Sequence, residues 1–316
     1  MDSITEKDAY GYSKALIDNV CQIFIGKREV VVSTVLALLA DGHILLEDVP
    51  GVGKTLLAKA IAKSIDGTLK RIQFTADLLP TDVSGVTIFL QNSGDFSFRR
   101  GPVFSNILLG DEINRATPRT QSSLLEAMEE YQVTVDGKIY ELEKPFLVIA
   151  TQNPIELEGT YPLPFSQMDR FIVRLNIGYL DHDTEKQMLK DQKFSLALDQ
   201  IKAVLDCKTL VKIQEMIKHV TISDDLYDYI INIIHKTRNT DAIEYGVSPR
   251  GALDLMRFSQ ASAFINERDY VLPDDIKHSA PVVLGHRIIV KKGTRLATSG
   301  NKDIIDELVD TIKIPV

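Results

Sequence analysis

The chain contains little cysteine, no tryptophan and no long apolar run. Cys21 and Cys207 are the only cysteines among its 316 residues. Two cysteines so far apart indicate a reducing compartment and give no disulfide framework. The longest apolar stretch, about residues 30–40, is shorter than the ~20 residues that a transmembrane helix needs. The polar, acidic beginning of the chain is unlike a signal peptide. We therefore expect a cytoplasmic protein without a membrane span.

An excess of positive charge is also missing. The chain has 36 Lys and Arg residues against 44 Asp and Glu residues, a formal net charge of -8. This balance argues against broad binding of nucleic acid or membrane surfaces, although a local basic patch remains compatible with it. The apolar share of 44% and the charged share of 25% are those of a globular protein. At this length we expect two domains and a large core.

The most informative segment that is present is Asp48-Val-Pro-Gly-Val-Gly-Lys-Thr55. It follows the apolar run 44–46 and precedes the run 56–62, an order that predicts strand, glycine turn and helix, the setting of a phosphate-binding P-loop. The glycines let backbone N–H groups point at a phosphate, and the helix adds its positive dipole end. Asp48 stands where the motif has its first glycine. The residues predicted to bind nucleotide are Pro50, Gly51, Val52, Gly53, Lys54, Thr55 and Leu56.

A second segment, Ile107-Leu-Leu-Gly-Asp111-Glu112, is an apolar run that ends in two carboxylates. Asp111, together with the Thr55 hydroxyl, is suited to holding Mg²⁺. Glu112 is suited to orienting and deprotonating an attacking water. An Asp-Glu pair after a strand is a weak signal by itself, because many strand ends are simply solvated. Its position after a P-loop makes the two segments a strong joint signal for ATP hydrolysis.

Three further polar residues are candidates for catalysis. Asn153 follows the apolar run 146–151 and could hydrogen-bond the γ-phosphate or the water, or could be an ordinary turn asparagine before a proline. Arg170 could face the nucleotide of a neighbouring subunit and stabilise transition-state charge, or could be a surface arginine paired with Asp169. Arg250 opens a predicted helix and could reach back to the phosphates, or could lie on the surface.

The apolar pattern divides the chain into an α/β domain, residues 1–179, and an all-helical domain, residues 180–316, with a boundary near 177–183. In the first domain we expect helices at 1–25, 27–41 and 54–65 and strands at 43–47, 69–74, 105–110 and 146–151. Alternating segments predict β-hairpins at 86–98 and 132–142, with a helix between them. In the second domain we expect helices at 183–193, 208–219, 224–239, 249–266 and 273–284.

Several longer runs occur in a fixed order along the chain. They are Gly101-Pro-Val-Phe104, Asp111-Glu-Ile-Asn-Arg-Ala116, Gln121-Ser-Ser-Leu-Leu-Glu-Ala-Met-Glu-Glu130, Ala150-Thr-Gln-Asn-Pro154, Glu158-Gly-Thr-Tyr-Pro-Leu-Pro164 and Asp169-Arg-Phe171. Together with the P-loop, these residues resemble the AAA+ ATPases, and within them the MoxR and magnesium-chelatase branch. The resemblance covers nearly the whole chain. It departs from the family pattern at Gly110, at residues 165–168 and at Gly285.

The resemblance implies a P-loop AAA+ αβα core with a parallel sheet and two hairpin inserts, followed by a C-terminal all-α lid. It also implies ATP and Mg²⁺ as ligands and a ring homo-oligomer, most often a hexamer. It assigns Walker A to Gly51, Gly53, Lys54 and Thr55, Walker B to Asp111 and Glu112, sensor 1 to Asn153, the arginine finger to Arg170 and sensor 2 to Arg250.

The function that the resemblance implies is that of an ATP-driven chaperone. Such proteins remodel partner proteins or assist the insertion of metal cofactors, and the partners often carry a von Willebrand A domain. A nucleic-acid motor or loader on the same core is an alternative, but the acidic net charge disfavours it. Arg99-Arg100 is the adjacent basic pair that is a candidate for contacting nucleic-acid phosphate in that alternative. A P-loop kinase is a third class. Glu112 argues against it, because a kinase needs an acceptor hydroxyl rather than an activated water.

Overall fold

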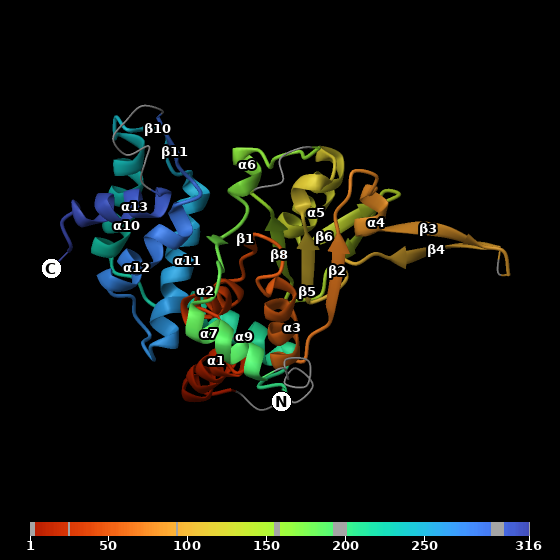
Figure 1. The fold of residues 1–316 in the computed structure, drawn as a ribbon, viewed down its shortest axis with the longest axis horizontal. Helices are drawn as coiled ribbons and strands as arrows, with labels where there is room; N and C mark the ends of the chain where they lie inside the picture. Colours follow the sequence, from red (N-terminus) through yellow and green to blue (C-terminus); the bar gives the residue numbers. More distant parts are fainter. Residues whose placement is uncertain are drawn as a thin grey trace.

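The computed structural model describes residues 4–24, 26–92, 94–154, 159–191, 201–291 and 300–315. Glu158 of the predicted motif and the last two residues of the helix predicted at 183–193 lie outside these ranges. We call the described residues before 180 the α/β part and those from 180 onward the helical part. In Figure 1 the helices α10 to α13 lie at one end of the molecule and a long hairpin projects from the other.

The α/β part is built on a five-stranded sheet in the order β2-β5-β8-β1-β9. Every pairing in it is parallel. β5 and β8 are almost wholly apolar because helices cover both faces of the sheet, and this confirms the predicted parallel sheet. β9, which was not predicted, has three residues. The strands are β1 (Ile44–Glu47), β2 (Leu69–Gln73), β5 (Ile107–Asp111), β8 (Leu147–Gln152) and β9 (Val173–Leu175).

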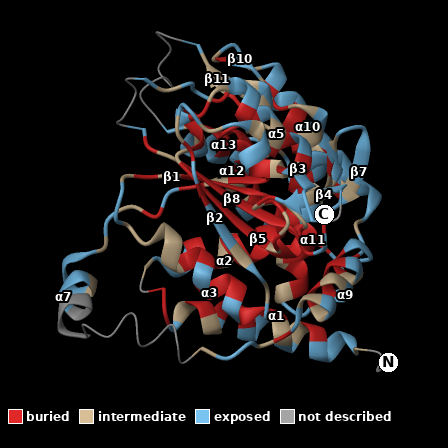
Figure 2. Ribbon diagram, turned by 90° about the vertical axis from the view of Figure 1, so that its right-hand side faces the viewer, coloured by how far each residue is buried: buried red, intermediate tan, exposed pale blue. Residues whose placement is uncertain are grey.

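Two apolar layers lie on the two faces of this sheet, and both are buried in Figure 2. Side chains of a strand alternate between faces, so Leu109 and Leu108 belong to different layers. Leu109 packs in the layer of α1 (Glu6–Cys21), α2 (Arg28–Leu39) and α3 (Lys54–Ser64). Leu108 packs in the layer of α5 (Pro118–Glu130), beside which lie the short helices α4 (Pro80–Ser84) and η1 (Ile113–Arg115). The short α6 (Phe165–Met168) precedes β9.

Both predicted hairpins are present. One is β3 (Gly85–Leu90) with β4 (Asp95–Arg100), and the other is β6 (Gln132–Val135) with β7 (Lys138–Glu141). Asp136 and Gly137 have φ values of 50° and 74°, the pair of positive values that a type I′ hairpin turn requires. The β3–β4 hairpin extends away from the sheet in Figure 1, and Phe96 near its tip is 75% exposed.

The helical part confirms the five predicted helices within one or two residues wherever it is described. It also contains a short antiparallel ribbon and a last helix that were not predicted. The elements are α7 (His182–Asp191), α9 (Cys207–Lys218), α10 (Asp224–Arg238), β10 (Ile243–Tyr245), α11 (Pro249–Ile265), α12 (Pro273–Leu284), β11 (Ile289–Val290) and α13 (Asn301–Asp310). No helix within the described ranges is long and apolar enough to cross a membrane.

The two parts share one core. Gln214 on α9 donates to the carbonyl oxygen of Leu38 on α2 at 2.7 Å, and residues of α11 lie in the same apolar cluster as residues of α2. A division of the chain near residues 177–183 therefore stays a prediction, because helices before and after that point pack together.

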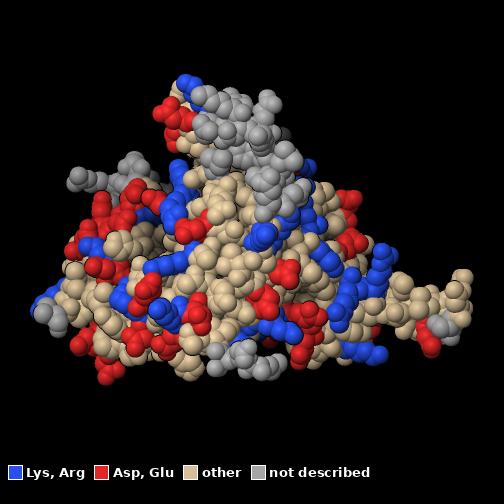
Figure 3. All heavy atoms as spheres, turned by 90° about the horizontal axis from the view of Figure 1, so that it is seen from below, with Lys and Arg blue, Asp and Glu red and all other residues tan. Residues whose placement is uncertain are grey.

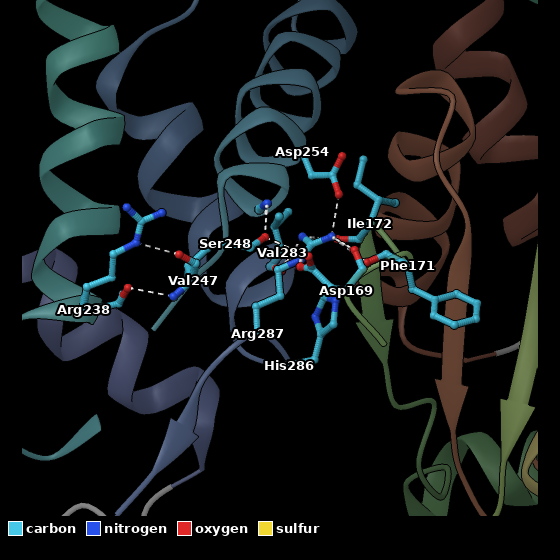
Figure 4. A network of polar contacts seen from close by, with 12 residues as sticks. Asp169, Phe171, Ile172, Arg238, Val247, Ser248, Asp254, Val283, His286 and Arg287 are labelled. Carbon is cyan, nitrogen blue, oxygen red and sulfur yellow. Dashed lines mark hydrogen bonds and ion pairs between the residues drawn. The ribbon is translucent and has the colours of Figure 1, made fainter. Parts of the chain in front are cut away.

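A buried arginine fastens the helical part to the end of the sheet (Figure 4). Arg287, after α12, is 1% exposed. Its Nε donates to Asp169 Oδ1 at 2.8 Å, and one Nη donates to Asp254 Oδ2 on α11 at 2.5 Å and to the carbonyl oxygen of Phe171 at 2.9 Å. Ser248, which caps α11, donates its hydroxyl to Asp169 Oδ2 at 2.7 Å. Asp169 is thus held by two groups of the helical part.

The departure at Gly285 has a steric reason. A Cβ atom at this position would lie 2.7 Å from the carbonyl oxygen of Pro281, closer than a carbon and an oxygen can approach. Glycine permits this approach of the α12 carbonyl to the segment that leads into Arg287.

Candidate nucleotide site

The predicted P-loop joins β1 to α3 and turns through two glycines in the left-handed region. Gly51 has a φ of 89° and Gly53 a φ of 99°, values that side chains other than glycine rarely adopt. Helix α3 begins at Lys54, so its first N–H groups and its positive dipole end lie beside the turn. The sequence prediction of strand, glycine turn and helix is confirmed.

A cleft of about 400 Å³ opens at this turn. It collects residues from the P-loop and from the carboxyl ends of three neighbouring strands, as parallel sheets commonly do at ligand sites. Its lining residues are Pro50, Gly51, Gly53, Lys54, Thr55, Leu56, Arg71, Gln73, Asp111, Glu112, Thr151 and Asn153. The structure thus brings Asp111, Glu112 and Asn153 together with the predicted site residues of the P-loop, of which only Val52 is not among these lining residues. Asn153 is 5% exposed.

Lys54 lies across the P-loop. Its Nζ donates to the carbonyl oxygen of Asp48 at 2.6 Å. Burial lowers the pKa of Lys54, and the negative charges of Asp48, Asp111 and Glu112 oppose that shift. The ammonium group is therefore partly desolvated and surrounded by acceptors, the state in which a phosphate oxygen would be a strong new partner.

Asp48, which departs from the P-loop pattern, has a structural role. Its carboxylate is buried, with the residue 3% exposed. It accepts from the backbone N–H of Gly178 at 3.0 Å and from the backbone N–H of Ile177. These two residues lead from β9 toward the helical part. Asp48 therefore ties the first position of the P-loop to the segment that connects the two parts.

Asp111 and Glu112 end β5 in different backbone conformations. Asp111 continues the strand and its side chain is only 11% exposed. Glu112 has a φ of 57°, and its N–H donates to the Thr151 hydroxyl at 2.9 Å. The same hydroxyl lies 3.4 Å from Asp111 Oδ1. Thr151 on β8 thus fixes the turn that sends the two carboxylates in different directions.

Glu112 is held by two side chains at one of its oxygens. Gln73 Nε2 donates to Glu112 Oε2 at 2.7 Å, and an Nη of Arg115 donates to the same oxygen at 3.2 Å. The Glu112 side chain is 22% exposed. Both contacts use Oε2, so neither of them occupies Oε1.

Arg71 and Gln73 were missed by the sequence analysis. Both lie on the edge strand β2, and Arg71 Nε is 2.6 Å from Asp111 Oδ2. A signal existed in residues 71–74, where polar and apolar residues alternate: Ile72 and Phe74 are buried, and Arg71 and Gln73 lie on the opposite face. Polar residues near the carboxyl end of β2 are candidates for the site, because β2 pairs with β5, the strand that ends in Asp111.

Arg170 and Arg250 do not line the cleft of their own chain. They meet instead at Glu129, at the end of α5. One Nη of Arg170 is 3.0 Å from Glu129 Oε2, and one Nη of Arg250 is 2.5 Å from Glu129 Oε1. Arg170 also donates to the carbonyl oxygen of Leu125 at 2.9 Å. Arg170 thus pairs with Glu129, while its neighbour Asp169 pairs with Arg287.

The departure at Gly110 is also explained by packing. A Cβ atom there would lie 3.0 Å from Cε2 of Phe74, a ring that is fully buried beneath the sheet. An alanine would require that ring to shift by a few tenths of an ångström. Glycine at this point of β5 and the phenylalanine after β2 are therefore a matched pair.

The residues present fit a magnesium–nucleotide ligand. Thr55 and Asp111 offer a hydroxyl and a nearly buried carboxylate to the same cleft, and oxygen ligands of this kind suit Mg²⁺, which keeps several waters and binds few protein groups. The cleft also holds two cationic side chains, Lys54 and Arg71, for phosphate oxygens. Within the described ranges no group of three or more His, Cys, Asp or Glu residues could hold a metal ion by itself.

Comparisons with known proteins agree with this geometry. Residues 43–173 match the ATPase family associated with various cellular activities (AAA), and residues 235–308 match the AAA lid domain. The chain is 44% identical to the "Uncharacterized protein YeaC" of Bacillus subtilis, over 98% of this chain and 97% of that protein. It is 37% identical to "Chaperone MoxR1" of Mycobacterium tuberculosis, over 95% of this chain and 81% of that protein.

A crystal structure points the same way. That structure is of a Cytophaga hutchinsonii protein, which is provisionally assigned as an ATPase. The two chains superpose with a TM-score of 0.91 and are 39% identical, and the match covers 98% of this chain and 97% of the Cytophaga hutchinsonii chain. The P-loop cleft, the matched AAA and lid segments and these full-length relatives lead to one conclusion. The chain belongs to the MoxR family of AAA+ ATPases and hydrolyses ATP.

Proposed function

We propose that this ATPase works as a ring of its own copies, six in the expected form, and uses ATP hydrolysis to remodel partner proteins. One observation carries the proposal. The P-loop, Asp111 and Glu112 share a cleft, whereas Arg170 and Arg250 lie together at Glu129 outside it. A site whose predicted arginines point away from its own cleft is one that a neighbouring copy would complete.

Within the cleft, the backbone of the P-loop and Lys54 bind the phosphates of ATP. Thr55 and Asp111 would hold Mg²⁺, and its charge would offset the negative charge of the outer phosphates. Glu112 accepts a proton from a water at Oε1, while Gln73 and Arg115 hold Oε2 in place. The water oxygen bonds to the γ-phosphorus as the bond from that phosphorus to the β–γ bridging oxygen breaks, which gives ADP and inorganic phosphate. Asn153, which lines the same cleft, orients the water or the γ-phosphate from the side.

Arg170 acts on the nucleotide of the next copy. Its guanidinium and that of Arg250 share a single carboxylate in the lone chain, so the two arginines carry more charge than Glu129 balances. A triphosphate presented by a neighbour would supply the missing negative charge, because bidentate arginine–phosphate contacts are strong and directional. Arg250 belongs to α11, and its share in this contact would connect the helical part to the nucleotide state.

The work done by hydrolysis is remodelling of a client protein. The support is the similarity to Chaperone MoxR1, and the predicted client or its adaptor carries a von Willebrand A domain, with insertion of a metal cofactor as the predicted outcome. A nucleic-acid motor is the weaker alternative. The face in Figure 3 carries Lys and Arg interspersed with Asp and Glu, without the continuous basic stripe that a nucleic-acid track requires. A cytoplasmic location stays a prediction.

Two variants test the enzyme directly. Lys54→Ala should abolish ATP binding, and Lys59→Ala, the same change at an exposed position on α3, should not. Glu112→Gln should bind ATP and hydrolyse it about 10²-fold or more slowly, because the water loses its base. Its matched control is Glu126→Gln on the exposed face of α5. Normal turnover by Glu112→Gln would remove Glu112 from the role of base.

The shared site is tested by mixing variants. Lys54→Ala and Arg170→Ala subunits should each be inactive, yet mixed rings should recover part of the ATPase activity at interfaces where an intact P-loop meets an intact arginine. The same mixture with Arg250→Ala tests the second arginine. Mixed rings that form but stay inactive would contradict a site shared between copies. A pull-down with Glu112→Gln and ATP, which should hold clients longest, then tests the chaperone role.

A further inference from the structure

The edge strand β2 supplies a cation to the cleft that the P-loop pattern does not include. Arg71 lines the cleft and its Nε donates to Asp111 Oδ2 at 2.6 Å. An Nη of the same guanidinium lies 3.3 Å from Gln73 Oε1. Its side chain is 55% exposed, whereas that of Asp111 is 11% exposed. Arg71 is therefore a long, solvent-accessible cation anchored at one end to the carboxylate that is predicted to hold Mg²⁺.

This contact conflicts with a loaded site. A divalent cation on Asp111 would repel the guanidinium, since like charges at ~4 Å interact unfavourably by several kcal/mol at a protein surface. Bound ATP would at the same time bring several negative charges into a cleft in which the charges of the described lining side chains, Lys54, Arg71, Asp111 and Glu112, sum to zero. Arg71 then loses its partner on β5 and gains acceptors on the phosphate chain a short distance away.

We propose that Arg71 is a second phosphate-binding cation of this cleft, held by Asp111 in the nucleotide-free chain and turned to the terminal phosphate of bound ATP. The inference rests on the proposed nucleotide site and adds to it a residue that contacts the γ-phosphate and so distinguishes ATP from ADP. Because β2 is the outermost strand next to β5, Arg71 approaches from the side of Asp111 and Glu112. Lys54 approaches from the P-loop. The two cations would therefore flank the phosphates from opposite sides.

The proposal has a consequence that a structural role for Arg71 lacks. If Arg71 contacts the terminal phosphate, its loss weakens ATP more than ADP. If Arg71 only keeps Asp111 in place, its loss weakens both nucleotides alike through the shared metal contact. The ratio of the two affinities therefore separates a phosphate ligand from a supporting residue.

The experiment compares Arg71→Gln with the full-length wild-type chain by calorimetry, using ADP and a non-hydrolysable ATP analogue, each with Mg²⁺. The affinity for the analogue should fall about tenfold or more, as loss of one charge-assisted hydrogen bond predicts, while that for ADP changes by less than about threefold. Arg71→Lys should recover part of the loss. Arg99→Gln, the same charge change on the exposed hairpin, should bind both nucleotides as the wild type does.

Equal losses for the two nucleotides, or no loss, would overturn the role of Arg71 while leaving the nucleotide site intact. Absence of binding by the wild type would instead overturn the proposed function. A thermal melt without nucleotide checks that Arg71→Gln is folded. If the glutamine variant is not folded, the two nucleotide affinities are measured with Arg71→Lys, which retains the charge.

Discussion

Arg287→Met is the substitution whose effect follows most directly from the structure. The Arg287 side chain is 1% exposed, and it forms ion pairs with Asp254 and Asp169, whose side chains are 13% and 17% exposed. Methionine fills a similar volume but donates no hydrogen bond. Removing one partner of a buried ion pair leaves an uncompensated charge and costs about 3–5 kcal/mol of unfolding free energy. For a chain of this size we expect the melting temperature to fall by about 5–8 °C.

The loss should depend on pH. Burial raises the pKa of Asp254, and the charge of Arg287 opposes that rise. Without Arg287, the native state holds the Asp254 proton to a still higher pH than the unfolded state does. Where the native state binds more protons than the unfolded state, the unfolding free energy falls as pH rises. The destabilisation by Arg287→Met should therefore be small near pH 4, close to the ordinary pKa of an aspartate, and larger at pH 7.5.

The assay is urea denaturation of wild type, Arg287→Met and Arg287→Met/Asp254→Leu at both pH values. The double variant should be more stable than the single one at pH 7.5, because it removes the stranded charge as well. Arg119→Met, on the exposed face of α5, is the control and should change stability by less than about 0.5 kcal/mol. A loss below about 1 kcal/mol for Arg287→Met at pH 7.5, or an equal loss at pH 4, would refute the reasoning.

Three further predictions concern single contacts. Asp48→Ala should lower the unfolding free energy by about 1–3 kcal/mol in urea titration, because two backbone N–H groups, one of them that of Gly178, lose their acceptor; a neutral result would show that water replaces the carboxylate. Glu129→Gln should lower it by less than about 1 kcal/mol, since that side chain is 35% exposed and such pairs contribute little; a larger loss would mean that the two arginines repel each other strongly. Gly110→Val should cost about 1–3 kcal/mol by overpacking against Phe74, and an unchanged melting temperature would show that the ring moves freely.

The sheet could be predicted wherever its strands carry a strong pattern. The apolar runs of β5 and β8 are typical of buried parallel strands, and the turn at Asp136-Gly137 has one favoured hairpin geometry. β9 has three residues with Arg174 in the middle, too short for any periodicity. It becomes a strand because β1 offers it an edge. The ribbon of β10 and β11 escaped prediction for the same reason.

The site could be predicted as far as its residues are adjacent to one another in sequence. The P-loop is a local motif, and so is the pair of carboxylates at 111–112. Arg71 and Thr151 join the site only through the pairing of β2, β5 and β8, and single-sequence patterns do not state which strands are neighbours. Arg287 was not predicted as an anchor, because its partners Asp169 and Asp254 come from two other segments.

The contacts around residues 169 and 170 show how the helical part can act on the arginine proposed to serve a neighbour. Arg287 and Ser248 hold Asp169 in buried or half-buried bonds, whereas Arg250 and Arg170 share the more exposed Glu129. Exposed pairs are cheaper to break than buried ones. If the helical part shifts relative to the sheet, the ion pairs at Glu129 therefore break first. Asp169 keeps its contacts with Ser248 and Arg287 and moves with α11 and α12. Because Arg170 is the next residue, its backbone follows Asp169. A movement of the helical part would thus release Arg170 from Glu129 and reposition it.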